Sequence, residues 1–170
     1  MRIRGIAMLA AVAWLGCNKS ETSPSGISSS CSVTLSGAVS GTYDCQPATT
    51  LWTSGSNQGG FSFGVTAATG KPAISAAVVW VGEPKDTSYT NADSAAGAQI
   101  TVTSSGQIWQ AQVGQGLAAT GSYSLSFTSV VQNGGNAGGK AYAADGTLNA
   151  TLPAVTASGA SGVVIVTATF

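Results

Sequence analysis

Residues 122–130, SYSLSFTSV, decide the fold class of this chain. The apolar residues Tyr123, Leu125 and Phe127 alternate with serine and threonine. Successive side chains of a β-strand point to opposite faces, so this stretch would be apolar on one face and polar on the other. A strand of that kind is typical of an antiparallel sheet with one buried face and one solvated face.

The same alternation recurs along most of the chain after residue 30. It marks further strands at 31–35, 43–45, 61–65, 74–80, 100–102, 109–113, 148–152 and 162–170. Helical periodicity is absent, and glycine, serine and asparagine separate the strands. We therefore expect an all-β fold, an antiparallel β-sandwich of the immunoglobulin-like or a related type with about eight or nine short strands. Asp145-Gly146 predicts a hairpin turn, and the glycine-rich residues 132–140 predict a loop.

The first thirty residues differ from the rest. Arg2 and Arg4 precede a short apolar run that ends at Cys17. This run is shorter than the roughly 20 apolar residues that a membrane-spanning helix needs, and it predicts a cleaved export signal over residues 1–16. Residues 17–30 are rich in serine and predict a flexible tether. Residues 31–170 are enough for a single domain with one core.

The tripeptide Leu15-Gly16-Cys17 resembles the end of a bacterial lipobox, although Trp14 stands where leucine is usual. With its serine-rich tether, the chain resembles the small lipoproteins of the Gram-negative envelope. The resemblance implies that Cys17 carries lipid and anchors the protein to a membrane. Asn18 is not the aspartate that usually retains such proteins at the inner membrane, which implies the outer membrane or cell surface. An ordinary secretory signal with an unmodified Cys17 is the alternative.

If Cys17 carries lipid, the chain's other two cysteines, Cys31 and Cys45, remain as a pair in an oxidising compartment. We expect a disulfide between them, across the open end of a hairpin whose strands flank Gly37 and Gly41. Metal binding by this pair is disfavoured, because the chain has no histidine and no CxxC motif.

Charge and composition restrict the function. Charged residues make up 7% of the chain, against about 25% in an average globular protein. Such a surface cannot neutralise a row of phosphates, which excludes nucleic acid as a partner. Without histidine there is no Ser-His-Asp triad, and the scattered carboxylates are interpreted as solvated turn residues. We expect no enzyme activity, no cofactor and no metal.

Three residues are the candidates for ligand binding: Trp52, Tyr89 and Asp93. Tryptophan rings on an uncharged surface can stack on sugars. Trp80 and Trp109 lie in alternating strands and are expected in the core, whereas Trp52 adjoins a loop and is expected to be exposed.

Tyr89 and Asp93 belong to residues 82–97, a charged segment expected to form a loop, and loops often carry function. Its Asp86, Asn91 and Asp93 offer oxygen ligands of the calcium type, but their spacing matches no known calcium loop.

The sequence thus favours a lipid-anchored, non-enzymatic envelope module that binds a glycan or an envelope protein. A pilin-like or adhesin-type subunit that assembles through sheet edges is the first alternative. A small outer-membrane β-barrel is the second.

Overall fold

The computed structural model describes residues 30–46, 48–114 and 119–170. The predicted signal peptide, the lipidation site Cys17 and all but the last residue of the tether lie outside these ranges. No helix in the described ranges is long and apolar enough to cross a membrane. The elements are β1 (Ser32–Gly37), β2 (Gly41–Asp44), β3 (Thr49–Thr53), β4 (Gln58–Val65), β5 (Ala73–Val81), β6 (Ser88–Thr90), β7 (Ala96–Ser104), β8 (Gln107–Val113), β9 (Ser122–Asn136), β10 (Gly139–Pro153), a short 3₁₀ helix (Thr156–Ser158) and β11 (Val163–Thr169).

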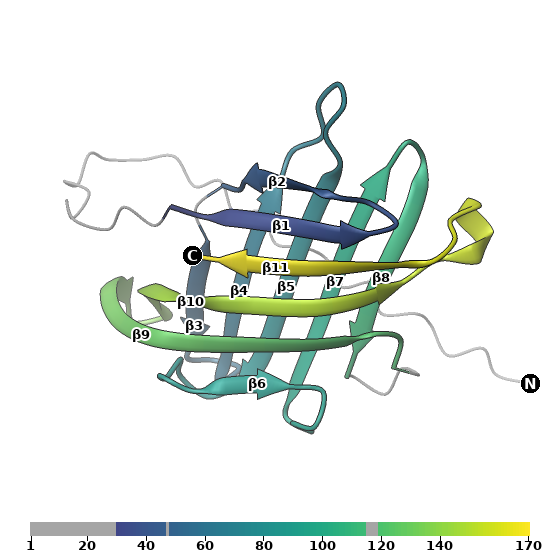
Figure 1. The fold of residues 1–170 in the computed structure, drawn as a ribbon. Coiled ribbons are helices and arrows are strands. Elements are labelled where there is room, and N and C mark those ends of the chain that lie inside the picture. The colour runs from purple at the N-terminus through teal and green to yellow at the C-terminus, as the bar shows by residue number, and fades with distance from the viewer. Residues whose placement is uncertain (1–29, 47, 115–118) are drawn as a thin grey trace, which may run out of the picture.

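The strands form two layers that cross at a large angle (Figure 1). The front layer has the order β2-β1-β11-β10-β9-β6, and the rear layer has the order β3-β4-β5-β7-β8. Every strand pair is antiparallel. Among the described residues, the path of paired strands ends at β2 and β8. The predicted all-β antiparallel sandwich is confirmed.

The long strand β10 joins the two layers. Its first residues, Gly139–Tyr142, pair with β3 of the rear layer. Its last residues, Thr147–Pro153, pair with β11 of the front layer. Irregularities in the pairing with β9 fall between Ala141 and Tyr142 and between Asp145 and Gly146. Bulges of this kind bend a strand, which lets the β9–β10 hairpin leave one layer and enter the other.

The core lies between the layers and follows the predicted alternation. In β9 the buried residues are Tyr123, Leu125 and Phe127, as expected. Trp80 and Trp109 are each 2% exposed, which confirms that both belong to the core. Phe61, Phe127 and Phe170 pack ring against ring with centroids 4.4–6.0 Å apart. Aromatic packing of this kind stabilises the interface between the layers beyond its area of burial.

Three details of the predicted strand pattern are wrong. The described residues form eleven strands rather than eight or nine, because β3 and β6 are short and do not alternate clearly. Residues 132–140 are not a loop but continue β9 and begin β10. Asp145-Gly146 is not a turn but lies inside β10. Gly146 is required there because a Cβ atom would collide with the backbone oxygen of Ser126.

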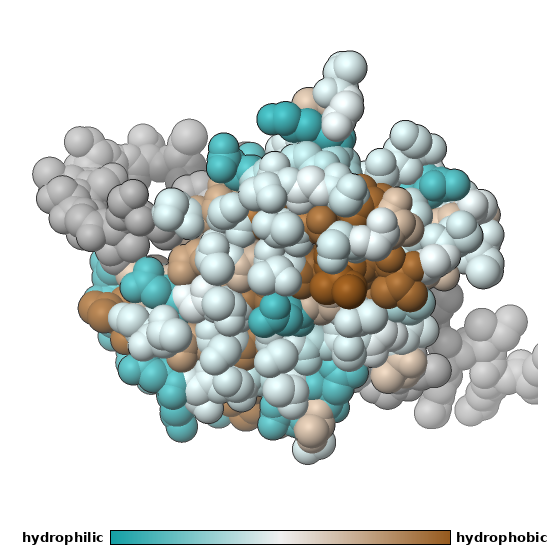
Figure 2. Space-filling view, viewed as in Figure 1, coloured by the Kyte–Doolittle hydropathy of each residue, from teal (hydrophilic) through white to brown (hydrophobic). Residues whose placement is uncertain are grey.

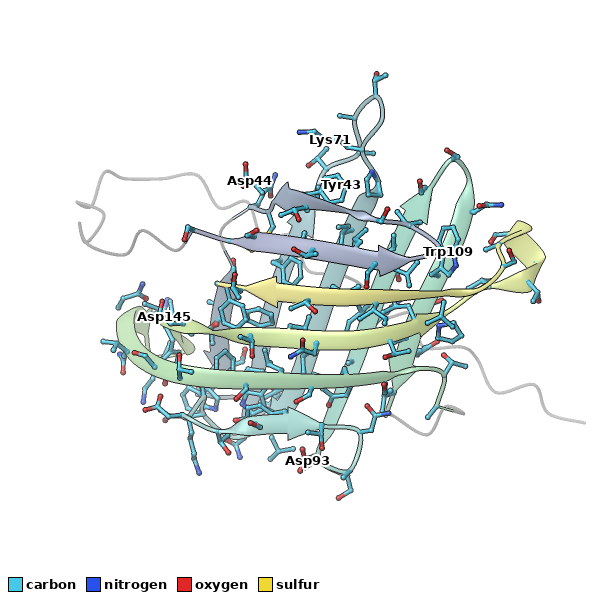
Figure 3. All side chains as sticks on the ribbon, in the orientation of Figure 1. Tyr43, Asp44, Lys71, Asp93, Trp109 and Asp145 are labelled. Carbon is cyan, nitrogen blue, oxygen red and sulfur yellow. A yellow bond between two sulfur atoms is a disulfide. The ribbon has the colours of Figure 1, made fainter. Side chains whose placement is uncertain are left out.

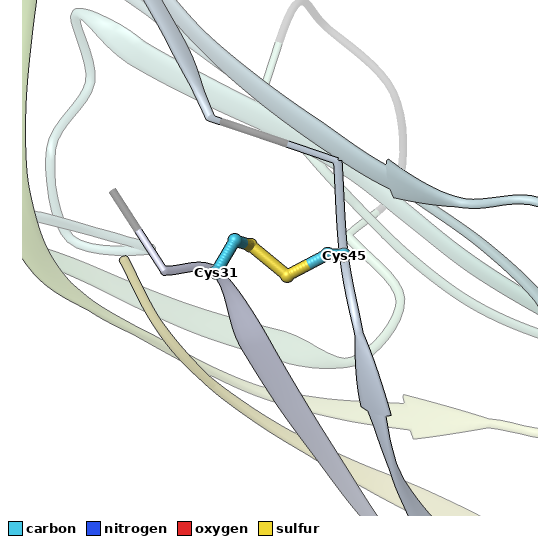
Figure 4. The surroundings of a disulfide bond; sticks show 2 residues. All are labelled: Cys31 and Cys45. Carbon is cyan, nitrogen blue, oxygen red and sulfur yellow. A yellow bond between two sulfur atoms is a disulfide. The ribbon is translucent and has the colours of Figure 1, made fainter. Parts of the chain in front are cut away.

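Cys31 and Cys45 form a disulfide, with Cα atoms 5.0 Å apart (Figure 4). The bond bridges the open end of the β1–β2 hairpin, as predicted, and the Cys45 N–H also donates to the Cys31 carbonyl at 3.0 Å. A cross-link over 14 residues stabilises a fold by about 3 kcal/mol on the chain-entropy model.

Candidate functional site: a rim of three joined loops

Three connections meet at one end of the sandwich, and we call this end the rim. They are the β3–β4 turn, the β5–β6 loop and the β9–β10 turn. Ser54 in the first turn donates from its N–H to the Gly138 carbonyl at 3.2 Å and from its hydroxyl to the Ala137 carbonyl at 3.1 Å. The Gly82 N–H donates to the Asn57 carbonyl at 2.8 Å. These bonds hold the three connections in one fixed arrangement.

Glu83 is the polar centre of the rim. Its Oε1 lies 2.8 Å from the ammonium nitrogen of Lys140, and its Oε2 accepts a 2.7 Å hydrogen bond from the Tyr142 hydroxyl. The side chains of Lys140 and Glu83 are 34% and 42% exposed, so the pair is accessible to solvent. Lys140 and Tyr142 share one face of β10 because their positions differ by two, and β3 sets Lys140 opposite Trp52.

Trp52 forms the aromatic part of the rim. Its ring is half-buried, and the Lys140 ammonium lies 5.2 Å from its centroid, within cation–π range. Its indole N–H donates to Asn57 Oδ1 at 3.3 Å. Asn57 has a φ of 48°, a left-handed conformation that asparagine adopts more readily than most residues. The turn therefore presents both the side-chain oxygen and the backbone carbonyl of Asn57 to neighbouring loops.

The network changes the acid–base properties of its members. Hydrogen bonds from Lys140 and Tyr142 hold the pKa of Glu83 below its ordinary value, so the carboxylate is ionised. Desolvation raises the pKa of Tyr142, and the hydrogen bond to Glu83 and the negative charge of Glu83 raise it further, to about 12. Tyr142 is therefore a neutral hydrogen-bond donor at physiological pH. Glu83 and Lys140 thus place one negative and one positive charge in contact, and these two charges balance.

Tyr89, a predicted candidate, lies against the core beside the rim. Its ring stacks on that of Trp80, with centroids 4.5 Å apart and planes at 20°. Burial raises the pKa of Tyr89, and the nearby Asp93 adds to this effect. Trp80 in turn covers Gly59, which pairs directly with Trp52 in the neighbouring strand. The stack of Tyr89 on Trp80 thus packs against β4, the strand that pairs with β3 and therefore lies beside Trp52.

Asp93, the third candidate, closes a turn. Its Oδ2 accepts hydrogen bonds from the Thr90 N–H at 2.6 Å and from the Thr90 hydroxyl at 3.3 Å. Figure 3 places it at the lower end of the molecule, by β6. Asn91 accepts from the Tyr123 N–H at 2.7 Å and donates to the Gly121 carbonyl at 3.2 Å. Asp93 Oδ2 and Asn91 Oδ1, two of the oxygens considered for calcium, therefore already accept hydrogen bonds from the protein.

A second group of polar side chains lies at the opposite end. Tyr43, Asp44 and Lys71 gather there in Figure 3. They line a shallow hollow of about 300 Å³ beside the disulfide, with Gln46 and Thr66. Among the residues that line this hollow, the Tyr43 hydroxyl donates to the Ser40 carbonyl at 3.3 Å, a contact within the β1–β2 hairpin.

Within the described ranges, no three Cys, Asp or Glu side chains lie close enough together to hold a metal ion. The three comparisons with known proteins give no relative: no family model, no curated protein and no solved structure matches this chain.

Of the predicted ligand residues, only Trp52 belongs to the hydrogen-bonded rim. Glu83, interpreted from sequence as a solvated turn residue, is its centre, and neither Lys140 nor Tyr142 was predicted to take part. The sequence does hold one signal for them: Lys140 and Tyr142 are bulky polar residues, two apart, after a run of glycines. The pairing of Lys140 with Trp52 and of Tyr142 with Thr50 depends on strand register, which no local sequence pattern predicts.

Proposed function

We propose that this protein is a lipid-anchored, non-enzymatic module of the bacterial envelope that binds a neutral glycan at the rim. The observation that carries the proposal is the convergence of Trp52, Glu83, Lys140 and Tyr142 from three separate elements: β3, the β5–β6 loop and β10. Glycan binding needs an aromatic surface for the apolar face of a sugar and fixed polar groups for its hydroxyls. The rim supplies both.

The charge balance of the rim favours a neutral ligand. Glu83 and Lys140 form an ion pair at 2.8 Å. A charged ligand would have to break this pair before it could form an ion pair with either side chain. Sugar hydroxyls both donate and accept hydrogen bonds, and they could use the remaining lone pairs of Glu83 and the free N–H groups of Lys140 without separating the pair. A glycan is therefore favoured over a charged protein surface.

The position of the rim agrees with an anchor at Cys17. The tether would join the domain at Cys31, which is bridged to Cys45, and the next residue, Gln46, donates to the Gly64 carbonyl at 2.9 Å. Gly64 lies at the end of β4, whereas Asn57 and the rim lie at its beginning. The eight residues of β4 are extended by about 3.4 Å each, which separates the two ends by about 24 Å. The rim would point away from the membrane.

The sheet edges favour a binding module over a subunit that assembles by strand addition. On the outer side of β8, Ile108 donates to the Ser158 hydroxyl at 2.9 Å and accepts from the Val155 N–H at 2.8 Å. Thr120 and Gln112 exchange two hydrogen bonds of 2.9 Å on the same edge. The β2 edge is four residues long. Covered or short edges of this kind oppose edge-to-edge assembly.

Two experiments test the proposal. For the site, the Cys17→Ser protein is applied to an array of neutral oligosaccharides, alongside the same protein with Trp52→Ala or Glu83→Gln. We expect binding that falls at least tenfold in both variants. Binding that survives both changes, or no binding to any neutral sugar, would contradict the site.

For the anchor, radiolabelled palmitate should be incorporated into the wild-type protein and not into Cys17→Ser. A wild-type protein without label would contradict lipidation.

A further inference from the structure

The outer face of the front layer carries three rows of side chains across the strands, and most of these side chains are hydroxyls or amides. Register defines the rows, because residues paired between antiparallel strands lie side by side on one face. The first row is Asp44, Ser32, Thr169, Thr147, Ser126 and Ser88; the second is Thr42, Thr34, Thr167, Asn149, Ser124 and Thr90; the third is Ser36, Ile165, Thr151 and Ser122. We call these residues the front face.

The front face has almost no charge. Asp44, at one corner, is its single ionisable residue. Its hydroxyls interact along the rows: Thr34 and Thr42 are hydrogen-bonded at 3.1 Å, and Ser88 donates to Ser126 at 2.9 Å. Neighbouring side chains lie about 4.8 Å apart within a row, and rows are about 6.8 Å apart, because these are the spacings of strands and of alternate residues. A full row crosses six strands, or about 24 Å.

An exposed apolar patch adjoins the hydroxyl rows. Figure 2 shows the front face as a mostly pale surface with one brown patch. Val163 and Ile165, neighbours on the outer side of β11, are 42% and 47% exposed. Sugars present both hydroxyls and apolar C–H faces, so a glycan could use the rows and the patch together.

The outer face of the rear layer is different. Two of its rows are interrupted by glycine, alanine or valine: Ser62, Ala77, Gln99 and Gln112 form one, and Gly60, Val79 and Gly97 form another; a third row, Ser75, Thr101 and Gln110, is polar but crosses only three strands. Two rows of the front face therefore cross six strands without an apolar residue, and the rear layer has no polar row of that length. A substitution on the rear face can therefore serve as a control for a substitution on the front face.

We infer that the front face is a second binding surface, for the extended chain of a neutral polysaccharide. An uncharged face suits an uncharged partner, because no ion has to lose its water when the two meet. Each serine or threonine hydroxyl can either donate a hydrogen bond to a sugar hydroxyl or accept one from it. Each hydroxyl pair gains little over its bonds to water, so binding needs many pairs at once. The face should therefore hold polymers and not short oligosaccharides. This inference extends the proposed glycan-binding role, with the rim as the site for short sugars.

Co-sedimentation with insoluble neutral polysaccharides tests the inference. The probes are microcrystalline cellulose, curdlan and granular starch, and the protein is the Cys17→Ser chain. Thr167→Lys places a long charged side chain in the centre of the front face, where Thr167 is exposed. Gln99→Lys adds the same charge to the exposed rear face and is the matched control. We expect the Thr167→Lys protein to lose at least tenfold in affinity for one of these polymers, and Gln99→Lys to lose less than twofold.

The outcomes separate this inference from the proposed function. Polymer binding that Thr167→Lys weakens and Glu83→Gln leaves intact supports the front face, whatever the rim does with oligosaccharides. Polymer binding that only Glu83→Gln weakens overturns the front face and leaves the rim standing. Equal affinity of Thr167→Lys and wild type overturns the inference, as does a failure to sediment with any polymer. A double Thr34→Ala, Asn149→Ala variant, which removes polar groups without adding charge, should weaken polymer binding as well.

Discussion

The hydroxyl of Tyr142 donates a 2.7 Å hydrogen bond to Glu83, a residue 59 positions away in the sequence. This bond ties the β9–β10 hairpin to the loop after β5, and the ion pair of Lys140 with the same carboxylate reinforces it. The rim is thus held by contacts between distant segments, and its chemistry can be tested by titration.

Stability should fall in strongly alkaline solution partly because of Tyr142. Its pKa is raised to about 12 in the folded protein, above the ordinary value of 10.0. The unfolded chain then loses this proton at lower pH than the folded chain, so the contribution to stability is full below pH 10 and is lost as the pH rises towards 12. Tyrosinate absorbance should show one fewer late ionisation in Tyr142→Phe than in wild type. A variant that instead lacks an ionisation near the ordinary value of 10.0 would contradict the raised pKa of Tyr142.

Tyr123→Phe should stabilise the protein or leave its stability unchanged. The Tyr123 hydroxyl is buried and has no hydrogen-bond partner in the described ranges, and burial raises its pKa to about 12. Removing an unpaired buried hydroxyl recovers about 1 kcal/mol of desolvation cost. Urea unfolding of the variant measures the change. Trp109→Phe should instead lower the free energy of unfolding, because the Trp109 indole N–H donates to the Ser161 carbonyl at 3.1 Å and the variant removes this hydrogen bond. A loss of stability in Tyr123→Phe would show that the hydroxyl has a partner.

The adjacent glycines Gly59 and Gly60 should respond differently to alanine. A Cβ atom at Gly59 would collide with the Trp80 indole, whereas at Gly60 the nearest atom would be 3.9 Å away. Gly59→Ala should cost about 1–3 kcal/mol, the usual range for overpacking a core. Gly60→Ala should change stability by less than about 0.5 kcal/mol, as for most surface substitutions. Thermal unfolding of the two variants decides this, and equal midpoints would contradict the packing of Trp80 over β4.

Loss of the disulfide should weaken the whole domain. The double variant Cys31→Ser, Cys45→Ser should unfold with about 3 kcal/mol less free energy, because the unfolded chain is no longer restrained. Reduction of the wild-type protein should give a similar loss, measured by urea unfolding with and without reductant. A reduced protein as stable as the oxidised one would contradict the assignment.

The sequence predicts those strands whose pattern is governed by burial. Tyr123, Leu125 and Phe127 alternate with polar residues because one face of β9 meets the core and the other meets water. β3 reads TTLWT and lacks that alternation, since Leu51 is exposed on the outer face while Thr50 is buried. Local pattern therefore could not reveal β3.

The glycine-rich end of the β9–β10 hairpin was missed for a different reason. Glycine is disfavoured in strands, but here the backbones lie too close for a side chain: a Cβ atom at Gly139 would be 2.6 Å from the Trp52 carbonyl oxygen. The rim was missed with it, because Glu83, which follows β5, meets Lys140 of β10 only through the strand order β10-β3-β4-β5. Trp52 alone was predicted, as an aromatic residue beside a loop.

The most direct test of the proposed function follows the indole N–H signals of the tryptophans by NMR during titration with a neutral oligosaccharide. Trp52 lies in the rim, whereas Trp109 is buried near the opposite side of the molecule and serves as an internal reference (Figure 3). The proposal predicts a saturable shift of the Trp52 signal, with the Trp109 signal unchanged and the Trp52 shift reduced in Glu83→Gln. A Trp52 signal that stays fixed with every neutral sugar tested would contradict it.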